Sequence, residues 1–249
     1  MLCFIYLIEY ARLRSQHKFA LDMTHQIHTK QLISYLSQYV TDHKKNLIDQ
    51  VLNQRTRHLT VVLENIYQSQ NASAVFRTVE CFGIQDVHLI ENENAYGVNR
   101  RVLKGADKWL TIKHHNQPNV NNTPLCFEHL KKEGYKILAT TPTASMSIQE
   151  VDVSQKLAIV MGNELHGLSE EAQEAADVKV KIPMQGFTES LNLSVSAAIC
   201  IYELIAKIRS SKMNWQLTTK EQEALRLIWY RKSIRRSEII EKKYLESIK

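Results

Sequence analysis

"KLAIVMGNELHGLSEE", residues 156–171, combines an uninterrupted apolar run with a polar, glycine-containing loop. Residues 156–162 lack the alternation of apolar and polar side chains that a half-buried strand shows, so they predict a strand buried on both faces. Strands of that kind occur almost only in parallel sheets that helices cover on both sides. Glu170 and Glu171 are typical of the first turn of a helix. The segment therefore predicts a strand, a loop and a helix of an α/β sheet.

The same alternation of strands and helices extends on both sides of this segment. Further strands are predicted at 60–64, 86–90, 136–140 and 178–182, and helices at 71–83, 124–134, 169–176 and 191–210. No internal repeat or low-complexity stretch interrupts the pattern. We therefore expect an α/β fold with a mainly parallel sheet and helices on both of its faces.

The two ends of the chain differ from its middle. Residues 28–54 and 218–246 repeat apolar side chains at helical spacing, which predicts helical N- and C-terminal extensions. We place the first extension at 23–59, the α/β domain at 60–210 and the second extension at 211–249. Residues 1–22 are expected to be a poorly structured tail or an artefact of an upstream start, because Met23 would also serve as a start.

Positive charge is concentrated in these extensions. Residues 1–60 carry eight Lys and Arg against four Asp and Glu, and residues 212–249 carry ten against five. Residues 61–211 carry fourteen against seventeen, and the whole chain has a net charge of +6. Two interpretations stay open: basic extensions that hold a polyanion beside a small-molecule site, or solvated helices without a ligand.

Composition argues against several kinds of site and location. The apolar run at residues 1–8 is much shorter than the ~20 residues of a membrane span, and it lacks the features of a signal peptide. The four cysteines show neither metal-ligand nor disulfide spacing, which favours a reducing cytoplasm. The seven glycines form no dinucleotide or Walker loop. Adjacent His114 and His115 would point to opposite faces of a strand with no Cys or Asp cluster beside them, so we expect a solvent-facing loop pair and no metal.

Three polar clusters follow three of the predicted strands. They are ENIYQSQNASAVFR from Glu64, MGNELHGLSEE from Met161 and IPMQGFTESLNLS from Ile182. Ligands of open α/β sheets collect at the carboxyl ends of strands, where loops and helix N-termini expose backbone N–H groups. Taken singly, each cluster has a structural explanation, such as helix N-caps at Asn71 and Ser169. Three clusters at one edge of the sheet favour a binding site.

These clusters resemble, in order and spacing, the three motifs of the SpoU branch of the SPOUT RNA methyltransferases. The matching patterns are N-x-x-x-x-x-N-x-S-A-x-x-R-T from Asn65, M-G-N-E-x-x-G-L-S-E-E from Met161 and I-P-M-x-G-x-x-x-S-L-N-x-S-V-x-A-A from Ile182. Within that branch, GADKW at 105–109 and the helical flanks resemble the tRNA (guanosine-2′-O)-methyltransferases that act on the D-loop guanosine at position eighteen. Ser69-Gln70 and Leu193 depart from the common proline and valine, at positions that are not catalytic.

The resemblance implies both a fold and a reaction. It implies a deep trefoil knot, which the strand pattern does not predict, because chains as a rule do not thread their own loops. It implies S-adenosylmethionine as methyl donor, the 2′-hydroxyl of an RNA ribose as acceptor, and a homodimer whose active site draws on both subunits. The implied cofactor-binding residues are Thr140, Met161, Gly162, Ile182, Met184 and Leu191.

The resemblance also gives a reason for an arginine in an apolar helix. Arg77 stands among Val75, Phe76 and Val79, where a buried helix face would hold no charge. The resemblance implies that Arg77 is the catalytic arginine at the subunit boundary. A guanidinium stays protonated in proteins, so we interpret Arg77 as a clamp that holds phosphate, orients the hydroxyl and stabilises negative charge on oxygen. The alternative is a structural salt bridge to a neighbouring acid. The other implied catalytic residues are Asn71, Glu164, Ser190 and Asn192.

The basic flanks are expected to supply affinity for RNA, since neutralisation of phosphates dominates nucleic-acid binding. The predicted RNA-binding residues are Arg55, Arg57, Arg231, Lys232, Arg235 and Arg236. Three functions stay open: a tRNA ribose methyltransferase, a ribosomal RNA 2′-O-methyltransferase of the same branch, and a catalytically silent RNA-binding protein. The second often carries a separate domain of ~100 residues, and the roughly 60 residues ahead of the α/β domain are too few for it. The intact motif residues favour an enzyme, and we favour tRNA as its substrate.

Overall fold

The computed structural model describes residues 28–97 and 99–248, and the chain divides into two units. Gln54–Leu217 form the larger unit. The residues before Gln54 and those from Thr218 onward form the smaller one. The expectation for residues 1–22 lies outside the described residues.

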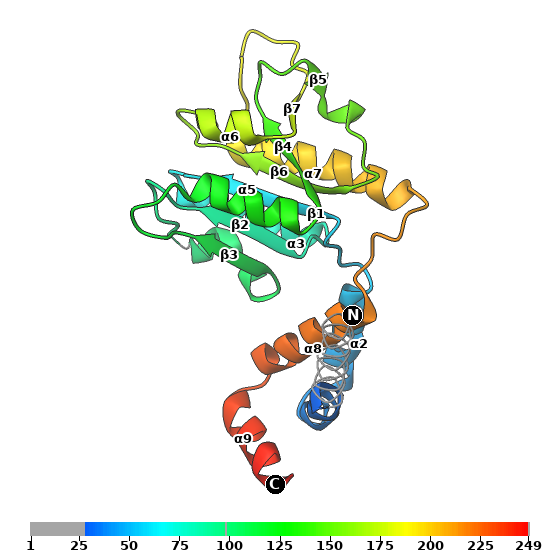
Figure 1. Cartoon of the computed structure of the whole chain (residues 1–249). Coiled ribbons are helices and arrows are strands. Elements are labelled where there is room, and N and C mark those ends of the chain that lie inside the picture. Colours follow the sequence, from blue (N-terminus) through cyan, green and yellow to red (C-terminus); the bar gives the residue numbers. More distant parts are fainter. Residues whose placement is uncertain (1–27, 98, 249) are drawn as a thin grey trace, which may run out of the picture. The chain divides into compact units, whose positions relative to one another are not determined.

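Within the described residues, the larger unit is built on a seven-stranded sheet whose paired strands are all parallel, in the order β3-β2-β1-β6-β4-β7-β5 (Figure 1). The strands are β1 (Leu59–Glu64), β2 (Asp86–Ile90), β3 (Thr111–His115), β4 (Tyr135–Thr140), β5 (Met146–Ser147), β6 (Lys156–Met161) and β7 (Val178–Lys181). β1 and β6 pair with each other near the middle, where Val61 lies opposite Ile159. The predicted class, a parallel α/β sheet, is confirmed.

Helices cover both faces of this sheet. The helices are α3 (Ser69–Cys81), α4 (Arg100–Leu103), α5 (Asn122–Lys132), α6 (Glu170–Ala175) and α7 (Leu193–Ser210), with short 3-10 turns η1 (Ala106–Lys108) and η2 (Ile148–Glu150). Leu157 and Ile159 of β6 pack in a cluster with buried residues of α3 and α7. Ala158 and Val160, which point the other way, pack with residues of α5 and α6. The apolar run of β6 is therefore buried on both faces, as its pattern predicts.

Helix α3 begins earlier than its sequence pattern predicts. Its N-cap is Gln68, which makes no side-chain capping bond, so the reading of Asn71 as an N-cap is wrong. The Glu164 carboxylate accepts hydrogen bonds from the backbone N–H groups of Tyr67 and Gln68, at 3.0 and 3.2 Å. A side chain from a distant loop thus does what a local cap usually does. Sequence spacing gives no signal for such a partner.

The edge strands β3 and β5 were not predicted from the sequence. β3 carries Thr111, Lys113 and His114, so its apolar signal is weak, and it pairs with β2 alone. β5 is only two residues long and pairs with β7. The backbone of a neighbouring strand, more than local side-chain preference, decides whether such edge segments become strands.

The smaller unit is helical, as predicted for the two extensions. Residues 28–37 form a helix, followed by α2 (Asp42–Leu52), α8 (Thr219–Ser233) and α9 (Ser237–Ser247). Helix α2 contacts α8, and the Arg226 guanidinium pairs with the Asp49 carboxylate at 2.7 Å. The fully or nearly buried side chains include Leu36, Leu52 and Trp229. Segments from the two ends of the chain therefore fold together.

Two further expectations concern the fold as a whole. The trefoil knot implied by the resemblance stays a prediction, because strand order and pairing do not describe how a chain threads. Among the helices that the structure describes, none has the length and apolar character needed to cross a bilayer.

Candidate active site

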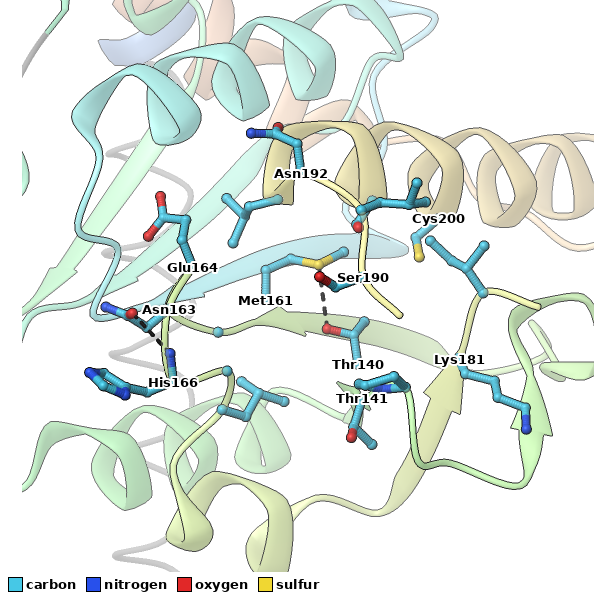
Figure 2. Close-up of a pocket in the computed structure, with 18 of the residues that line it drawn as sticks. Thr140, Thr141, Met161, Asn163, Glu164, His166, Lys181, Ser190, Asn192 and Cys200 are labelled. Carbon is cyan, nitrogen blue, oxygen red and sulfur yellow. Dashed lines mark hydrogen bonds between the residues drawn. The ribbon is translucent and has the colours of Figure 1, made fainter. Parts of the chain in front are cut away.

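A pocket of about 690 Å³ lies at the carboxyl ends of β4, β6 and β7 (Figure 2). Its volume is in the range of sites that enclose a small organic ligand. Side chains from all three polar clusters line it. Of the eleven predicted catalytic and cofactor-binding residues, ten line this pocket: Asn71, Thr140, Met161, Gly162, Glu164, Ile182, Met184, Ser190, Leu191 and Asn192. The structure thus brings together residues from distant segments, and the role of each stays a prediction.

The loop after β6 is closed on itself. Asn163 and Gly167 exchange two backbone hydrogen bonds, at 2.8 and 2.9 Å. A Cβ atom on Gly162 would lie 2.2 Å from the backbone carbon of Gly167, so only glycine fits there. The Asn163 side chain accepts from the backbone N–H groups of Leu165 and His166, the second of which Figure 2 shows as a dashed line. These hydrogen bonds fix the backbone of the loop that carries Glu164.

A chain of side-chain hydrogen bonds joins the three polar clusters. The Asn71 amide donates to the Glu164 carboxylate at 2.8 Å. The Asn192 amide donates to the Asn71 carbonyl oxygen at 3.2 Å. Asn192 also caps α7, because its carbonyl oxygen accepts from the backbone N–H of Ser194 at 2.9 Å. Asn71 is therefore hydrogen-bonded to Glu164, 93 positions away in the sequence, and to Asn192, 121 positions away, and all three line the pocket.

The pocket wall between β4 and α7 presents no reactive nucleophile. The Thr140 hydroxyl donates to the Val160 carbonyl at 2.7 Å and lies 3.5 Å from the Met161 sulfur, the contact dashed in Figure 2. Burial raises the pKa of the Cys200 thiol to about 12, so this pocket-lining cysteine is neutral at neutral pH. Because the thiolate is the nucleophilic form of cysteine, Cys200 does not compete for an electrophile held here.

Sequence reasoning missed a buried carboxylate at the carboxyl end of β1. Glu64 ends β1, and its carboxylate accepts from the Thr123 hydroxyl at 2.6 Å and from the Ser169 hydroxyl and N–H at 2.8 and 3.0 Å. These bonds tie the start of α6 to β1. A glutamate closing an apolar strand was the available signal, because a buried carboxylate must find donors. The pocket also includes Gln68, Asn163 and Cys200, which had no predicted role.

Arg77 is the one predicted catalytic residue that does not line this pocket. Its side chain is exposed, whereas Val75, Phe76 and Val79 are buried on the other side of α3. The apolar neighbours and the cation therefore occupy different faces of one helix. Among the described residues Arg77 takes part in no ion pair, so the structure does not show the salt bridge considered as its alternative.

Arg55 was predicted to bind RNA, and the structure corrects this. Its side chain is 0% exposed, and it donates to the Ile84 carbonyl at 3.0 Å and to the Glu80 carboxylate at 2.8 Å. Burial lowers its pKa, and the Glu80 charge opposes that shift. A guanidinium enclosed in this way holds the start of β1 to α3 and does not reach a phosphate. The charge count of a flank does not distinguish a buried arginine from an exposed one.

The other predicted RNA-binding residues have different surroundings. Arg57 pairs with Asp86 at 2.9 Å, and Arg231 pairs with Glu241. Lys232, Arg235 and Arg236 are exposed at the end of α8 and just after it. All five stay predictions, and the three exposed cations are the strongest of them.

The expectation for the histidine pair, a solvent-facing loop with no cysteine cluster beside it, is wrong in two respects. His114 and His115 do point to different surroundings, since His114 pairs with Glu91 at 2.7 Å. They belong to a strand and not to a loop, and His115 is grouped with His88 and Cys126. The cysteine comes from α5, which the sequence spacing does not place beside β3.

The fold and the pocket define a class of protein: a parallel α/β protein with a small-ligand site at the carboxyl edge of its sheet. Residues 58–202 match the SpoU rRNA Methylase family. The chain is 42% identical over 210 residues to the tRNA (guanosine(18)-2′-O)-methyltransferase of Borreliella burgdorferi, which covers 84% of this chain and 94% of that protein. The chain therefore belongs to the SpoU methylase family.

Solved structures agree with this assignment. The Aquifex aeolicus TrmH/SpoU tRNA modifying enzyme superposes with a TM-score of 0.70 at 29% identity, covering 78% of this chain and 98% of that one. The SpoU methyltransferase AviRb of Streptomyces viridochromogenes, solved with AdoMet, superposes with a TM-score of 0.56 at 21% identity, covering 66% and 65%. The second likeness shows the fold alone.

Proposed function

We propose that this protein transfers a methyl group from S-adenosylmethionine to the ribose 2′-hydroxyl of the guanosine at position eighteen of tRNA. The observation that carries the proposal is the hydrogen-bonded chain from Glu164 through Asn71 to Asn192, which joins three motif segments at one pocket. The Borreliella and Aquifex relatives, which are named for tRNA methylation and modification, support tRNA as the substrate.

The pocket suits S-adenosylmethionine in size and in chemistry. Thr140 ends β4, Ile182 and Leu191 lie in the loop between β7 and α7, and Met161, Gly162 and Met184 also line the pocket. When bound, the cofactor supplies an electrophilic methyl group on a positively charged sulfonium. Among the lining residues, the Cys200 thiol is neutral and Glu164 and Glu189 are acidic, so two acidic side chains accompany Lys181, whose positive charge would oppose such a ligand.

A second copy of the chain completes the proposed site. Helix α7 buries one face against the sheet yet exposes Val195, Ile199 and Tyr202 at helical spacing on another. A helix that is apolar on both sides is typical of a buried one, and we propose that the partner subunit covers this surface. Arg77, exposed and outside its own pocket, would then reach the pocket of the partner. There it clamps phosphate and orients the 2′-hydroxyl.

Methyl transfer and its target are tested together with purified protein, labelled S-adenosylmethionine and transcribed RNA. We expect about one methyl group per tRNA, recovered after digestion as 2′-O-methylguanosine. A tRNA with a 2′-deoxyguanosine at position eighteen is the matched control and should accept none. Label in a ribosomal RNA fragment but not in tRNA would contradict the proposed substrate. Absence of cofactor binding by calorimetry would contradict the enzyme itself. We place the reaction in the cytoplasm, where tRNA is abundant.

The exposed cations of the smaller unit are expected to contact tRNA phosphates. Replacing Arg235 and Arg236 by glutamine should weaken tRNA binding and reduce the slope of log K against log salt by roughly 1.4–1.8, since each phosphate contact contributes about 0.7–0.9. The measurement is a salt series of tRNA dissociation constants. Lys132→Gln on α5, an exposed cation paired with Glu128, is the control and should leave the slope unchanged. An unaltered slope in the double variant would remove these residues from the interface.

A further inference from the structure

Three potential metal-binding side chains converge on the face of the sheet that α5 covers. His88 lies on β2, His115 ends β3 and Cys126 lies on α5. Each offers one ligand atom, and these atoms all lie within 4.8 Å of one another. His88 and Cys126 are buried, at 1% and 0% exposure, and His115 is partly buried. The group lies outside the methyl-transfer pocket, none of whose lining residues belong to it.

The two imidazoles lie close to the spacing that a shared ion requires. His88 Nδ1 and His115 Nε2 are hydrogen-bonded to each other at 3.0 Å, and the ring centroids are 5.3 Å apart. With Zn–N bonds of about 2.0–2.1 Å and tetrahedral angles, two ligating imidazoles have nitrogens roughly 3.3 Å and centroids roughly 5.2 Å apart. For both imidazoles to bind one ion, the rings must therefore tilt and the two nitrogens must move apart by a few tenths of an ångström.

A fourth ligand is available on the same helix. His129 follows Cys126 by three residues, which places both on one face of α5. Its ring centroid lies 6.2 Å from that of His88 and 6.3 Å from that of His115. The ring is 45% exposed and lies 3.5 Å from the Glu133 carboxylate, so a side-chain rotation can bring it nearer. The Glu133 carboxylate also pairs with the Lys113 ammonium on β3, at 3.4 Å, so this lysine, whose positive charge would oppose a bound cation, has an acidic partner.

We propose that His88, His115 and Cys126 bind a Zn²⁺ ion, with His129 as the fourth ligand. A set of one thiolate and three imidazoles is a tetrahedral donor set of the kind Zn²⁺ prefers, and four protein ligands make a closed, structural site. The ion ties β2, β3 and α5 together. It takes no part in methyl transfer, and the proposal does not depend on the proposed function.

The test uses Co²⁺ as a spectroscopic probe of a Zn²⁺ site in the full-length protein. Cys3 and Cys81 are first replaced by serine, so that Cys126 and Cys200 are the remaining thiols. The reduced, metal-free protein is titrated with Co²⁺. We expect about one ion per chain, with a thiolate-to-metal charge-transfer band and the ligand-field bands of four-coordinate cobalt, both abolished when Zn²⁺ displaces it.

Cys126→Ser should abolish the charge-transfer band and weaken binding by at least about 100-fold, because even partners outside the ligand set contribute ~10–100-fold. Cys200→Ser is the matched control, since Cys200 is also a buried thiol, and it should bind cobalt unchanged. His115→Gln removes a second proposed ligand at a partly exposed site and should also weaken cobalt binding. It keeps the test valid if Cys126→Ser fails to fold, and circular dichroism measures whether each variant is folded. Zn²⁺ should also raise the melting temperature of the parent protein and not that of Cys126→Ser. A parent protein that binds no ion, or a Cys126→Ser variant with an unchanged spectrum, overturns the proposal.

Discussion

Arg77→Lys is expected to lower the rate of methyl transfer to tRNA by about 10²–10³-fold, the usual effect of removing one donor that stabilises developing negative charge. Lysine keeps the positive charge but loses the planar fork that can hold two oxygens at once. Because Arg77 is proposed to contact the phosphate and ribose of tRNA and not the cofactor, the dissociation constant for S-adenosylmethionine should not change. Single-turnover rates with saturating tRNA measure the first quantity, and calorimetry measures the second.

Arg101→Lys provides the control for this experiment. Arg101 is an exposed arginine on α4 outside the pocket, and its replacement should leave the single-turnover rate unchanged. Loss of an exposed side chain changes stability by only about ±0.5 kcal/mol, so a folding defect does not explain a large loss of rate at Arg77. If Arg77→Lys turned over at the parent rate, the bidentate clamp would be wrong and a point charge would be enough.

Two inactive variants are expected to restore activity when they share a dimer. Glu164→Gln should disturb the pocket, because its carboxylate accepts from the N–H groups of Tyr67 and Gln68 and from the Asn71 amide. Arg77→Ala should leave the pocket of its own chain intact. If Arg77 serves the pocket of the partner subunit, a mixed dimer contains one complete site and one doubly defective site.

Co-expression of the two variants with different affinity tags makes this measurable. Random assembly gives half mixed dimers with one active site of two, so the population should recover about a quarter of the parent rate. A purified mixed dimer should recover about half. Co-expression of Glu164→Gln with Asn192→Ala, both in the same pocket, is the matched control and should recover nothing if the partner contributes only Arg77. No recovery by the Arg77→Ala pair would place Arg77 in its own subunit's site or outside any site.

The central sheet could be predicted because its signal is local. The five residues of β6 from Leu157 to Met161 each pack in a cluster on one face of the sheet or the other, so this run had to be apolar. Edge strands such as β3 meet one neighbour only, and their polar side chains carried little signal. The same reasoning placed the three clusters at one edge of the sheet, because the carboxyl ends of parallel strands lie together.

Single side chains were harder to place. Arg55 and Arg235 look alike in a charge count, yet one is enclosed by Glu80 and the Ile84 carbonyl and the other is exposed. Asn71 looked like a helix cap, but a carboxylate 93 residues away bonds to its amide. Such partners depend on which chain segments meet in space, and sequence distance carries no information about that.

The order of apolar and polar residues by itself determined the parallel sheet, the helical ends and the three polar clusters, because each is a regular repeat or a motif within a short span. Only the tertiary structure decided that Glu164, Asn71 and Asn192 form one hydrogen-bonded chain, that Arg77 stands apart from them, and that His88, His115 and Cys126 meet. The physical reason is that hydrogen bonds and metal ligation act over about 2–3 Å in space. The crossing of strands and helices sets which residues come that close, and no local pattern in the sequence records it.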